Sequence, residues 1–169
     1  QSAIEAHPKG LPGHFYYDPE IFGQTRDRIF FKTWQFACHQ SLIPEPGDYY
    51  AFSILDQDLF VVRQKDRSIR CFYNVCQHRG HQLVESTGRA RVITCPYHAW
   101  AYGLDGKLRG AVGVTEQTGI KKSEICLTSV RVEDLCGFLF VNLDSEAPSL
   151  QETFPGVEDE IRTLAPDID

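Results

Sequence analysis

The sequence has no methionine and no long apolar run, and its first ten residues show no signal-peptide pattern. Because an initiator methionine is missing, we expect the 169-residue chain to be a fragment or a processed form of a longer protein. The longest apolar stretch, residues 135–143, is interrupted by Gly137 and Asn142 and is far shorter than the about 20 residues of a membrane-spanning helix. Residues 1–10 lack the basic and apolar layout of a secretory signal. We therefore expect no membrane segment and a cytoplasmic location.

Basic residues and cysteines are also scarce. The chain has 17 Lys and Arg against 23 Asp and Glu, a net charge of −6 at pH 7, and no run of Lys and Arg offsets the acidic balance locally. This argues against nucleic acid as a partner, because tracking phosphates requires clustered cations. Six cysteines are too few for a disulfide scaffold in a chain of this length, so we expect metal ligands or buried thiols. The 42% of hydrophobic residues suffices for a globular core.

The residue pattern predicts a largely β fold with a helix near each end. Asp18 before Pro19 and Glu20 is a typical helix start, and the apolar spacing that follows predicts an amphipathic helix over residues 19–32. A second helix is expected over residues 149–164, interrupted near Pro155 and Gly156. Short β-rich runs separated by polar turns predict strands at residues 34–39, 49–54, 59–63, 69–75, 91–94, 100–104, 107–110, 127–132 and 137–142. We therefore expect an all-β domain built from antiparallel strands.

Two short motifs combine one cysteine with one histidine. One residue separates Cys76 from His78, and two residues separate Cys95 from His98. Both motifs follow a β-rich run, which places them on loops at one end of a sheet. The four side chains suit either one zinc ion bound by all four, or a Rieske [2Fe-2S] cluster in which the cysteines hold one iron and the histidines the other. The Cys-x-His spacing is shorter than zinc modules use and favours iron and sulfur, but spacing alone leaves both open.

The other cysteines and histidines lack partners at ligand spacing. A plant-type cluster that began at Cys71 would need a cysteine at position 79, which is Arg79. His81 is expected near the metal site but not as a ligand. Four cysteines are predicted to be small buried hydrophobic residues: Cys38, Cys71, Cys126 and Cys136. Three histidines are predicted to be surface or packing residues: His7, His14 and His39.

The residues around both motifs closely resemble the Rieske domain of the ring-hydroxylating oxygenase α subunits. The resemblance is carried by NVCQHRGH at residues 74–81 and CPYHAWAYGLDG at residues 95–106, and it extends from about Leu11 to Leu143. It implies that Cys76 and Cys95 hold one iron of a [2Fe-2S] cluster and that His78 and His98 hold the other. The shell implied around them consists of Arg79, Gly80, His81, Tyr97 and Trp100.

The resemblance also implies how the chain is organised. Residues 1–40 would be a helical segment packed on the domain, residues 41–145 a Rieske-type antiparallel β sandwich with cluster-binding loops, and residues 146–169 a linker and helix leading toward a catalytic domain. That domain would hold a mononuclear Fe(II) on two histidines and one carboxylate. Since no histidine follows His98, we expect no catalytic residue in this chain.

The implied function is electron transfer within an oxygenase. Single electrons would pass from a ferredoxin, or from a flavin- and NADH-dependent reductase, to the mononuclear iron of a mono- or dioxygenase, for O₂-dependent hydroxylation or N-demethylation. The full-length subunit would assemble as a homotrimer or an α3β3 complex. A self-standing Rieske ferredoxin, a carrier without a substrate, is the alternative from another class, and a structural zinc module is the third.

Several positions near the two motifs refine the resemblance. Respiratory Rieske proteins carry two further cysteines where this chain has His81 and Tyr97, and a serine where it has Trp100. Without that serine's hydrogen bond we expect a cluster of the low-potential oxygenase kind. Ala99 stands where glycine is common, and the CPYHAW motif with residues 122–127 is most similar to the branch that oxidises betaines, carnitine and related quaternary amines.

Overall fold

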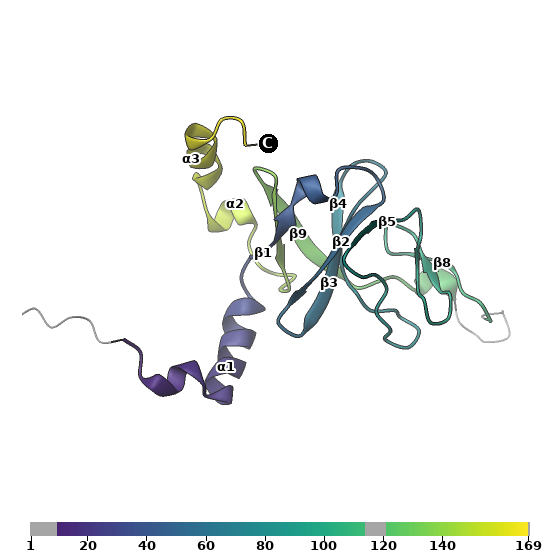
Figure 1. Cartoon of the computed structure of the whole chain (residues 1–169), viewed down its shortest axis with the longest axis horizontal. Coiled ribbons are helices and arrows are strands. Elements are labelled where there is room, and N and C mark those ends of the chain that lie inside the picture. The colour runs from purple at the N-terminus through teal and green to yellow at the C-terminus, as the bar shows by residue number, and fades with distance from the viewer. Residues whose placement is uncertain (1–9, 114–120, 169) are drawn as a thin grey trace, which may run out of the picture.

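Two sheets of antiparallel strands form the body of the structure, a computed structural model that describes residues 10–113 and 121–168 (Figure 1). The seven-stranded sheet has the order β1-β10-β9-β4-β3-β2-β5, and the three-stranded sheet has the order β6-β7-β8. The larger sheet consists of β1 (Gln35–His39), β2 (Asp48–Ile54), β3 (Gln57–Arg63), β4 (Ile69–Tyr73), β5 (Thr87–Arg89), β9 (Ser129–Leu135) and β10 (Phe138–Asn142). The smaller sheet consists of β6 (Ile93–Thr94), β7 (Ala101–Tyr102) and β8 (Leu108–Gly110). The predicted all-β class is confirmed.

Two strands differ from their predictions. The segment β5 has no apolar alternation, and it forms because it pairs with β2, where the Arg89 guanidinium donates to both carboxylate oxygens of Asp48 at 2.5 and 3.1 Å. The strand expected over residues 127–132 lies instead at Ser129–Leu135. Leu127 is buried before the strand begins, and its backbone N–H donates to the Gly106 carbonyl at 2.9 Å. Contacts between residues far apart in the sequence therefore determine where both strands form.

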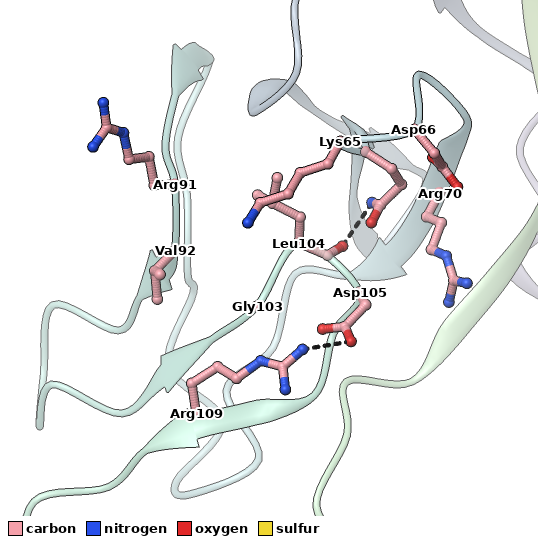
Figure 2. Close-up of a pocket in the computed structure, with 10 residues that line it drawn as sticks. Lys65, Asp66, Arg70, Arg91, Val92, Gly103, Leu104, Asp105 and Arg109 are labelled. Atoms are coloured by element: carbon pink, nitrogen blue, oxygen red, sulfur yellow. Dashed lines mark hydrogen bonds and ion pairs between the residues drawn. The ribbon is translucent and has the colours of Figure 1, made fainter.

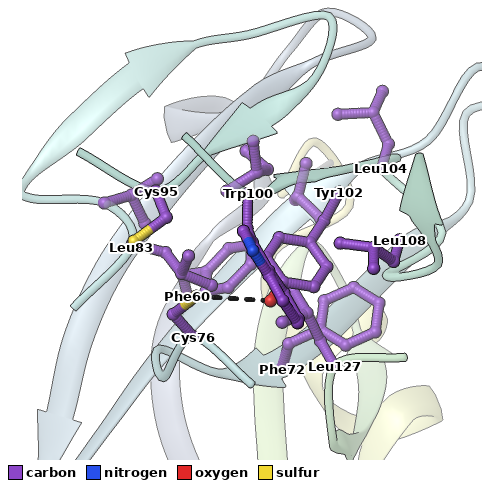
Figure 3. Close-up of a cluster of buried hydrophobic side chains, with 13 residues drawn as sticks. Phe60, Phe72, Cys76, Leu83, Cys95, Trp100, Tyr102, Leu104, Leu108 and Leu127 are labelled. Atoms are coloured by element: carbon purple, nitrogen blue, oxygen red, sulfur yellow. Dashed lines mark hydrogen bonds between the residues drawn. The ribbon is translucent and has the colours of Figure 1, made fainter. Parts of the chain in front are cut away.

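The strand β3 separates two hydrophobic cores. Its side chains alternate, as the two-residue period of a strand requires, so that Leu59 and Val61 enter one core while Phe60 and Val62 enter the other. The core that contains Phe60 and Val62 fills the space between the two sheets and is here named the inter-sheet core (Figure 3). It contains both cysteines of the predicted metal site. The hydrophobic packing of the domain therefore supports that site directly.

The N-terminal helix matches its prediction in position. The helix α1 (Pro19–Thr25) begins at Asp18, whose carboxylate accepts the Glu20 backbone N–H at 2.8 Å, and it continues into the π-helical turn η2 (Arg26–Phe30). The side chains of α1 and η2 are all at least partly exposed. The segment is joined to the β domain at its C-terminal end, where Lys32 pairs with Asp144 at 3.0 Å. Packing of the whole segment on the domain stays a prediction.

The remaining helices are short. The C-terminal pair α2 (Leu150–Thr153) and α3 (Val157–Leu164) confirms the predicted helix with its interruption, which occurs at Gly156. Single 3-10 turns lie at η1 (Gly13–Tyr16), η3 (Gln40–Leu42) and η5 (Lys122–Glu124). In Figure 1, α1, α2 and α3 lie at the opposite end of the molecule from β8. Among the described residues, none of the helices has the length and apolar character that crossing a bilayer requires.

Candidate functional site

Two loops carry the predicted ligands to one end of the inter-sheet core. Loop 1 (residues 76–81) follows β4, and loop 2 (residues 95–100) joins β6 to β7. Loop 2 is the tip of a hairpin in which Ile93 pairs with Tyr102 and Thr94 with Ala101. The sequence prediction that both motifs lie on loops after β-strands is confirmed.

The two loops have the same backbone turn. In loop 1 the Cys76 N–H donates to the His81 carbonyl at 2.9 Å, and the Gly80 N–H donates to the Cys76 carbonyl at 2.9 Å. In loop 2 the Cys95 N–H donates to the Trp100 carbonyl at 2.8 Å, and the Ala99 N–H donates to the Cys95 carbonyl at 3.0 Å. The fifth residue of each turn is left-handed, with φ of +70° at Gly80 and +55° at Ala99. Each loop therefore presents its cysteine from an equivalent backbone position.

A buried amide side chain ties down the segment that follows loop 1. Asn74 accepts the backbone N–H groups of Leu83 and Val84, both at 3.0 Å, and donates to the Val84 carbonyl at 2.7 Å. It is 1% exposed, so these bonds form where water cannot replace them. Asn74 closes loop 1 from both sides, a role that the sequence reasoning did not assign.

Both cysteine side chains are buried in the inter-sheet core. Cys76 and Cys95 are each 2% exposed, and neither forms a disulfide. Figure 3 shows their sulfur atoms at the same edge of this core, beside Leu83 and next to Trp100. The structure thus brings the two thiols together, 19 positions apart in sequence, as the motifs predicted.

The two histidines lie side by side above this edge. The imidazole rings of His78 and His98 have centroids 4.6 Å apart and are nearly perpendicular, at 72°. The buried indole of Trp100 stacks on His78 with 4.7 Å between centroids and an interplanar angle of 9°. His78 is exposed to solvent and His98 is half-buried. The imidazole half of the site therefore faces outward, whereas the thiol half faces the core.

One ring nitrogen of His98 indicates whether the site suits a metal group. The His98 Nδ1 atom is buried and has no hydrogen-bond partner among the described residues. A buried polar atom without a partner is costly, and such atoms are rare in folded proteins. Burial lowers the pKa of His98, and the neighbouring His78, Arg79 and His81 charges lower it further. The neutral imidazole that this favours is the form that binds a metal.

Tyr102 is a site residue that the sequence reasoning missed. Its hydroxyl lies 3.3 Å from Cys76 Sγ and accepts the Gln77 backbone N–H at 3.1 Å. Burial raises the pKa of Tyr102, and the bond to Cys76 raises it further, so the phenol stays protonated. The sequence reasoning had no local signal for this role, because the bond joins residues 26 positions apart.

The remaining shell residues surround the histidines. Tyr97, 56% exposed, packs on His98 with 3.7 Å between ring centroids, and His81 lies 5.5 Å from Tyr97 by the same measure. Arg79 and Gly80 lie in loop 1 and are exposed. The structure places all five predicted shell residues in loops 1 and 2. Two thiols and two imidazoles at one edge of the inter-sheet core can divide between two irons.

The other cysteines and histidines separate into confirmed and wrong predictions. Cys38, Cys71 and Cys136 are buried, as expected, and burial raises the pKa of the Cys38 thiol to about 11. The prediction for Cys126 is wrong, because its side chain is exposed where residue 126 bridges Lys107 at a sheet edge, while the next residue takes the buried place. His14 packs on Phe15 and His39 on Phe138, which confirms them as packing residues; His7 lies outside the described residues.

The fold and the two-loop site define a class of protein, and a comparison of the sequence with protein families agrees. Residues 33–122 match the family described as the Rieske [2Fe-2S] domain. This chain belongs to the Rieske [2Fe-2S] family, and its cofactor is a [2Fe-2S] cluster. The match sets aside the zinc interpretation that the spacing had left open.

Individual relatives narrow the class. The chain is 37% identical over 159 residues to the carnitine monooxygenase oxygenase subunit of Escherichia coli K12, and this match covers 94% of this chain and 42% of that protein. It is 40% identical over 139 residues to the naphthalene 1,2-dioxygenase large oxygenase component of Pseudomonas aeruginosa, and this match covers 80% of this chain and 31% of that protein. The apo crystal structure of the quaternary ammonium Rieske monooxygenase CntA superimposes with a TM-score of 0.89 at 34% identity, over 94% of this chain and 47% of that one. The chain therefore spans less than half the length of these relatives.

Proposed function

We propose that Cys76 and Cys95 hold one iron of the [2Fe-2S] cluster and that His78 and His98 hold the other. The observation that carries this assignment is the pair of equivalent turns, which presents two buried thiols and two adjacent imidazoles at one edge of the inter-sheet core. The buried, unpartnered Nδ1 of His98 supports it independently, because a metal bond would satisfy that atom.

The surrounding residues adapt this site to electron transfer. When bound, a Rieske cluster accepts and releases one electron at a time. With Cys76 bound to iron as a thiolate, the Tyr102 hydroxyl would donate its hydrogen toward the Cys76 sulfur, which favours additional negative charge there. Trp100 excludes water from the inner side of His78 by stacking on it. The exposed outer edge of His78 leaves the imidazole half of the site open to an approaching partner.

We further propose that this domain serves an oxygenase whose catalytic iron lies outside this chain. Relatives from two branches are oxygenase subunits, and the similarity to one of them extends over 94% of the chain, including the flanking helices. This extent supports an oxygenase subunit over a self-standing ferredoxin. One matching structure is described in terms of inter-subunit electron transfer, which supports an assembly of several subunits. Within it, a ferredoxin or a flavin reductase would supply the electrons. None of the six cysteines forms a disulfide, which supports a reducing, cytoplasmic setting.

The most extensive similarities support quaternary amines as the substrate class of the whole protein. The match to the carnitine monooxygenase subunit covers more of the chain than the match to the naphthalene dioxygenase component, 94% against 80%. The structural match is also better, with a TM-score of 0.89 for CntA against 0.80 for naphthalene 1,2-dioxygenase. N-demethylation or hydroxylation at a trimethylammonium group would follow in the catalytic domain.

The deciding experiment measures iron, acid-labile sulfide and zinc per chain on anaerobically purified protein, with the intact mass recorded on the same sample. We expect two irons and two sulfides on the 169-residue chain, and a third iron only on a longer chain. Zinc without sulfide would contradict the proposal. Substituting His98 by alanine should remove iron and sulfide together, whereas the same change at His81 should leave both in place.

A further inference from the structure

A basic pocket lies at the base of the hairpin that carries loop 2. Its volume is about 500 Å³, and it is bounded by the turn between β3 and β4, by the residues that lead into β6, and by the turn between β7 and β8. Figure 2 shows Lys65, Arg91 and Arg109 on different sides of this space. None of these residues takes part in the cluster site described above, so the pocket has a separate role to explain.

The charge of this pocket differs from that of the molecule. Four cations line it, against two carboxylates, in a chain whose net charge is −6. One carboxylate, Asp105, is already paired with Arg109 at 2.7 Å, and the other, Asp66, accepts both the N–H and the hydroxyl of Ser68. Within the described residues, Lys65 and Arg91 have no ion-pair partner. The pocket therefore offers exposed positive charge that the fold itself does not neutralise.

The wall of the pocket is built to hold its shape. The buried Gln64 amide donates to the Leu104 carbonyl at 2.7 Å, which links the β3 end to the β7–β8 turn. Gly103 lies so close beneath the Arg109–Asp105 pair that a Cβ there would approach the Asp105 carboxylate to 2.5 Å. The flexible cations at the rim thus extend from a backbone frame fixed by hydrogen bonds.

The pocket adjoins the cluster site through the shortest strands of the fold. Arg91 and Val92 directly precede β6, and Gly103 directly follows β7, while loop 2 lies at the other end of both strands. Cys95 lies three positions after Val92, a span of about 10 Å in extended chain. A protein bound at this pocket would therefore lie next to the cluster site, where the electron must enter.

We propose that this pocket is the docking site for the acidic surface of a one-electron donor protein. The inference rests on the proposed electron-transfer function and names the surface that its partner contacts. On docking, carboxylates of the donor would neutralise Lys65 and Arg91, after which the donor loses one electron and this domain gains one. The rim cations are exposed and flexible, which suits them to steering an encounter between proteins more than to enclosing a small molecule.

The test measures association directly and does not depend on catalysis. An acidic [2Fe-2S] ferredoxin, kept oxidised, is immobilised through a terminal tag, and the iron-loaded chain is passed over it at about 0.01 M and about 1 M ionic strength. The variants are Lys65→Glu with Arg91→Glu, and the matched control Arg28→Glu. Arg28 is an exposed residue of η2, at the opposite end of the molecule from β8, and has no ion-pair partner in the described residues.

We expect the double variant to lower the association rate constant about tenfold or more at low salt, and the difference to disappear at high salt, where the charges are screened. Arg28→Glu should change it less than twofold. An unchanged rate in the double variant, or an equal loss in the control, would overturn the docking site. Inhibition by inorganic phosphate beyond that of chloride at matched ionic strength would show a small-anion site and would also overturn it.

The same samples separate this inference from the function on which it rests. Iron, sulfide and the visible spectrum are recorded for each variant. Colour and two irons, together with an unaltered association rate, would leave the electron-transfer proposal standing and the docking site wrong. Absence of iron and sulfide in the parent chain would contradict both the electron-transfer proposal and the docking site.

Discussion

Loops 1 and 2 have the same turn but are held in place by different means. Loop 2 is fixed by backbone pairing, because β6 and β7 continue directly into it. Loop 1 has no such hairpin, and side chains hold it instead: Asn74 bonds the segment that follows it, and Tyr102 bonds its first two residues. The comparison shows that one backbone geometry can be specified locally in one place and by long-range contacts in another.

The largest effect is expected when either loop loses its thiol. Cys76→Ser and Cys95→Ser should both abolish iron loading, because each loop supplies half of the ligands and the binding energy of the metal group is also folding energy. Iron analysis and the visible spectrum measure this. The matched control is Cys71→Ala, a cysteine that is 1% exposed in the other core, which should keep the spectrum and lose about 1 kcal/mol of packing. A coloured, reducible Cys76→Ser protein would contradict the proposed ligand set.

A smaller but local effect is expected from Asn74→Leu. The change leaves the N–H groups of Leu83 and Val84 buried without a partner, which costs about 2 to 3 kcal/mol. Since only loop 1 depends on this side chain, hydrogen exchange should accelerate at residues 81–84 and stay slow in β6 and β7. The control Gln82→Leu removes a single bond to the Val84 carbonyl and should cost less than 1 kcal/mol. Equal acceleration in both loops would show that they are not held independently.

The hydroxyl of Tyr102 connects the two loops, and its removal should be visible in the reduction potential. Tyr102→Phe removes a hydrogen bond that favours the more negatively charged reduced form, so the potential should fall. A loss of about 1.4 kcal/mol corresponds to about 59 mV for one electron. Redox titration followed in the visible spectrum measures it. Tyr97→Phe is the control, because the contact of Tyr97 with His98 is made by its ring, which phenylalanine keeps. The reduction potential of this variant should stay within about 10 mV of the parent value.

What the sequence could predict follows the same division. The ligand motifs and the turn between β7 and β8 are local patterns, and the structure places them where the spacing indicated. The bond from Tyr102 to Cys76 joins residues 26 positions apart, and no short pattern encodes it. The strand β5 was missed for the same reason, since its register depends on the Asp48–Arg89 pair. Cys126 was misjudged because apolar neighbours do not say which side of a strand edge is buried.

The subtlest test exchanges the left-handed residues of the two turns. Gly80→Ala should destabilise the protein by about 1 kcal/mol through its positive φ alone, because nothing lies within 4 Å of the added Cβ. Ala99→Gly should stabilise by less, since the relief of the φ of +55° is partly offset by the entropy of glycine in the unfolded chain. For a chain of this size, 1 kcal/mol corresponds to about 2 to 4 °C in the midpoint of colour loss, measured at one scan rate.

Combining the two exchanges decides whether the turns are equivalent. If each turn responds only to its own left-handed residue, the double variant should lie at the sum of the two single shifts. A double variant well below that sum would mean that the two turns are coupled. The coupling would then pass through Tyr102, which lies in the strand β7 that follows loop 2 and bonds the first two residues of loop 1.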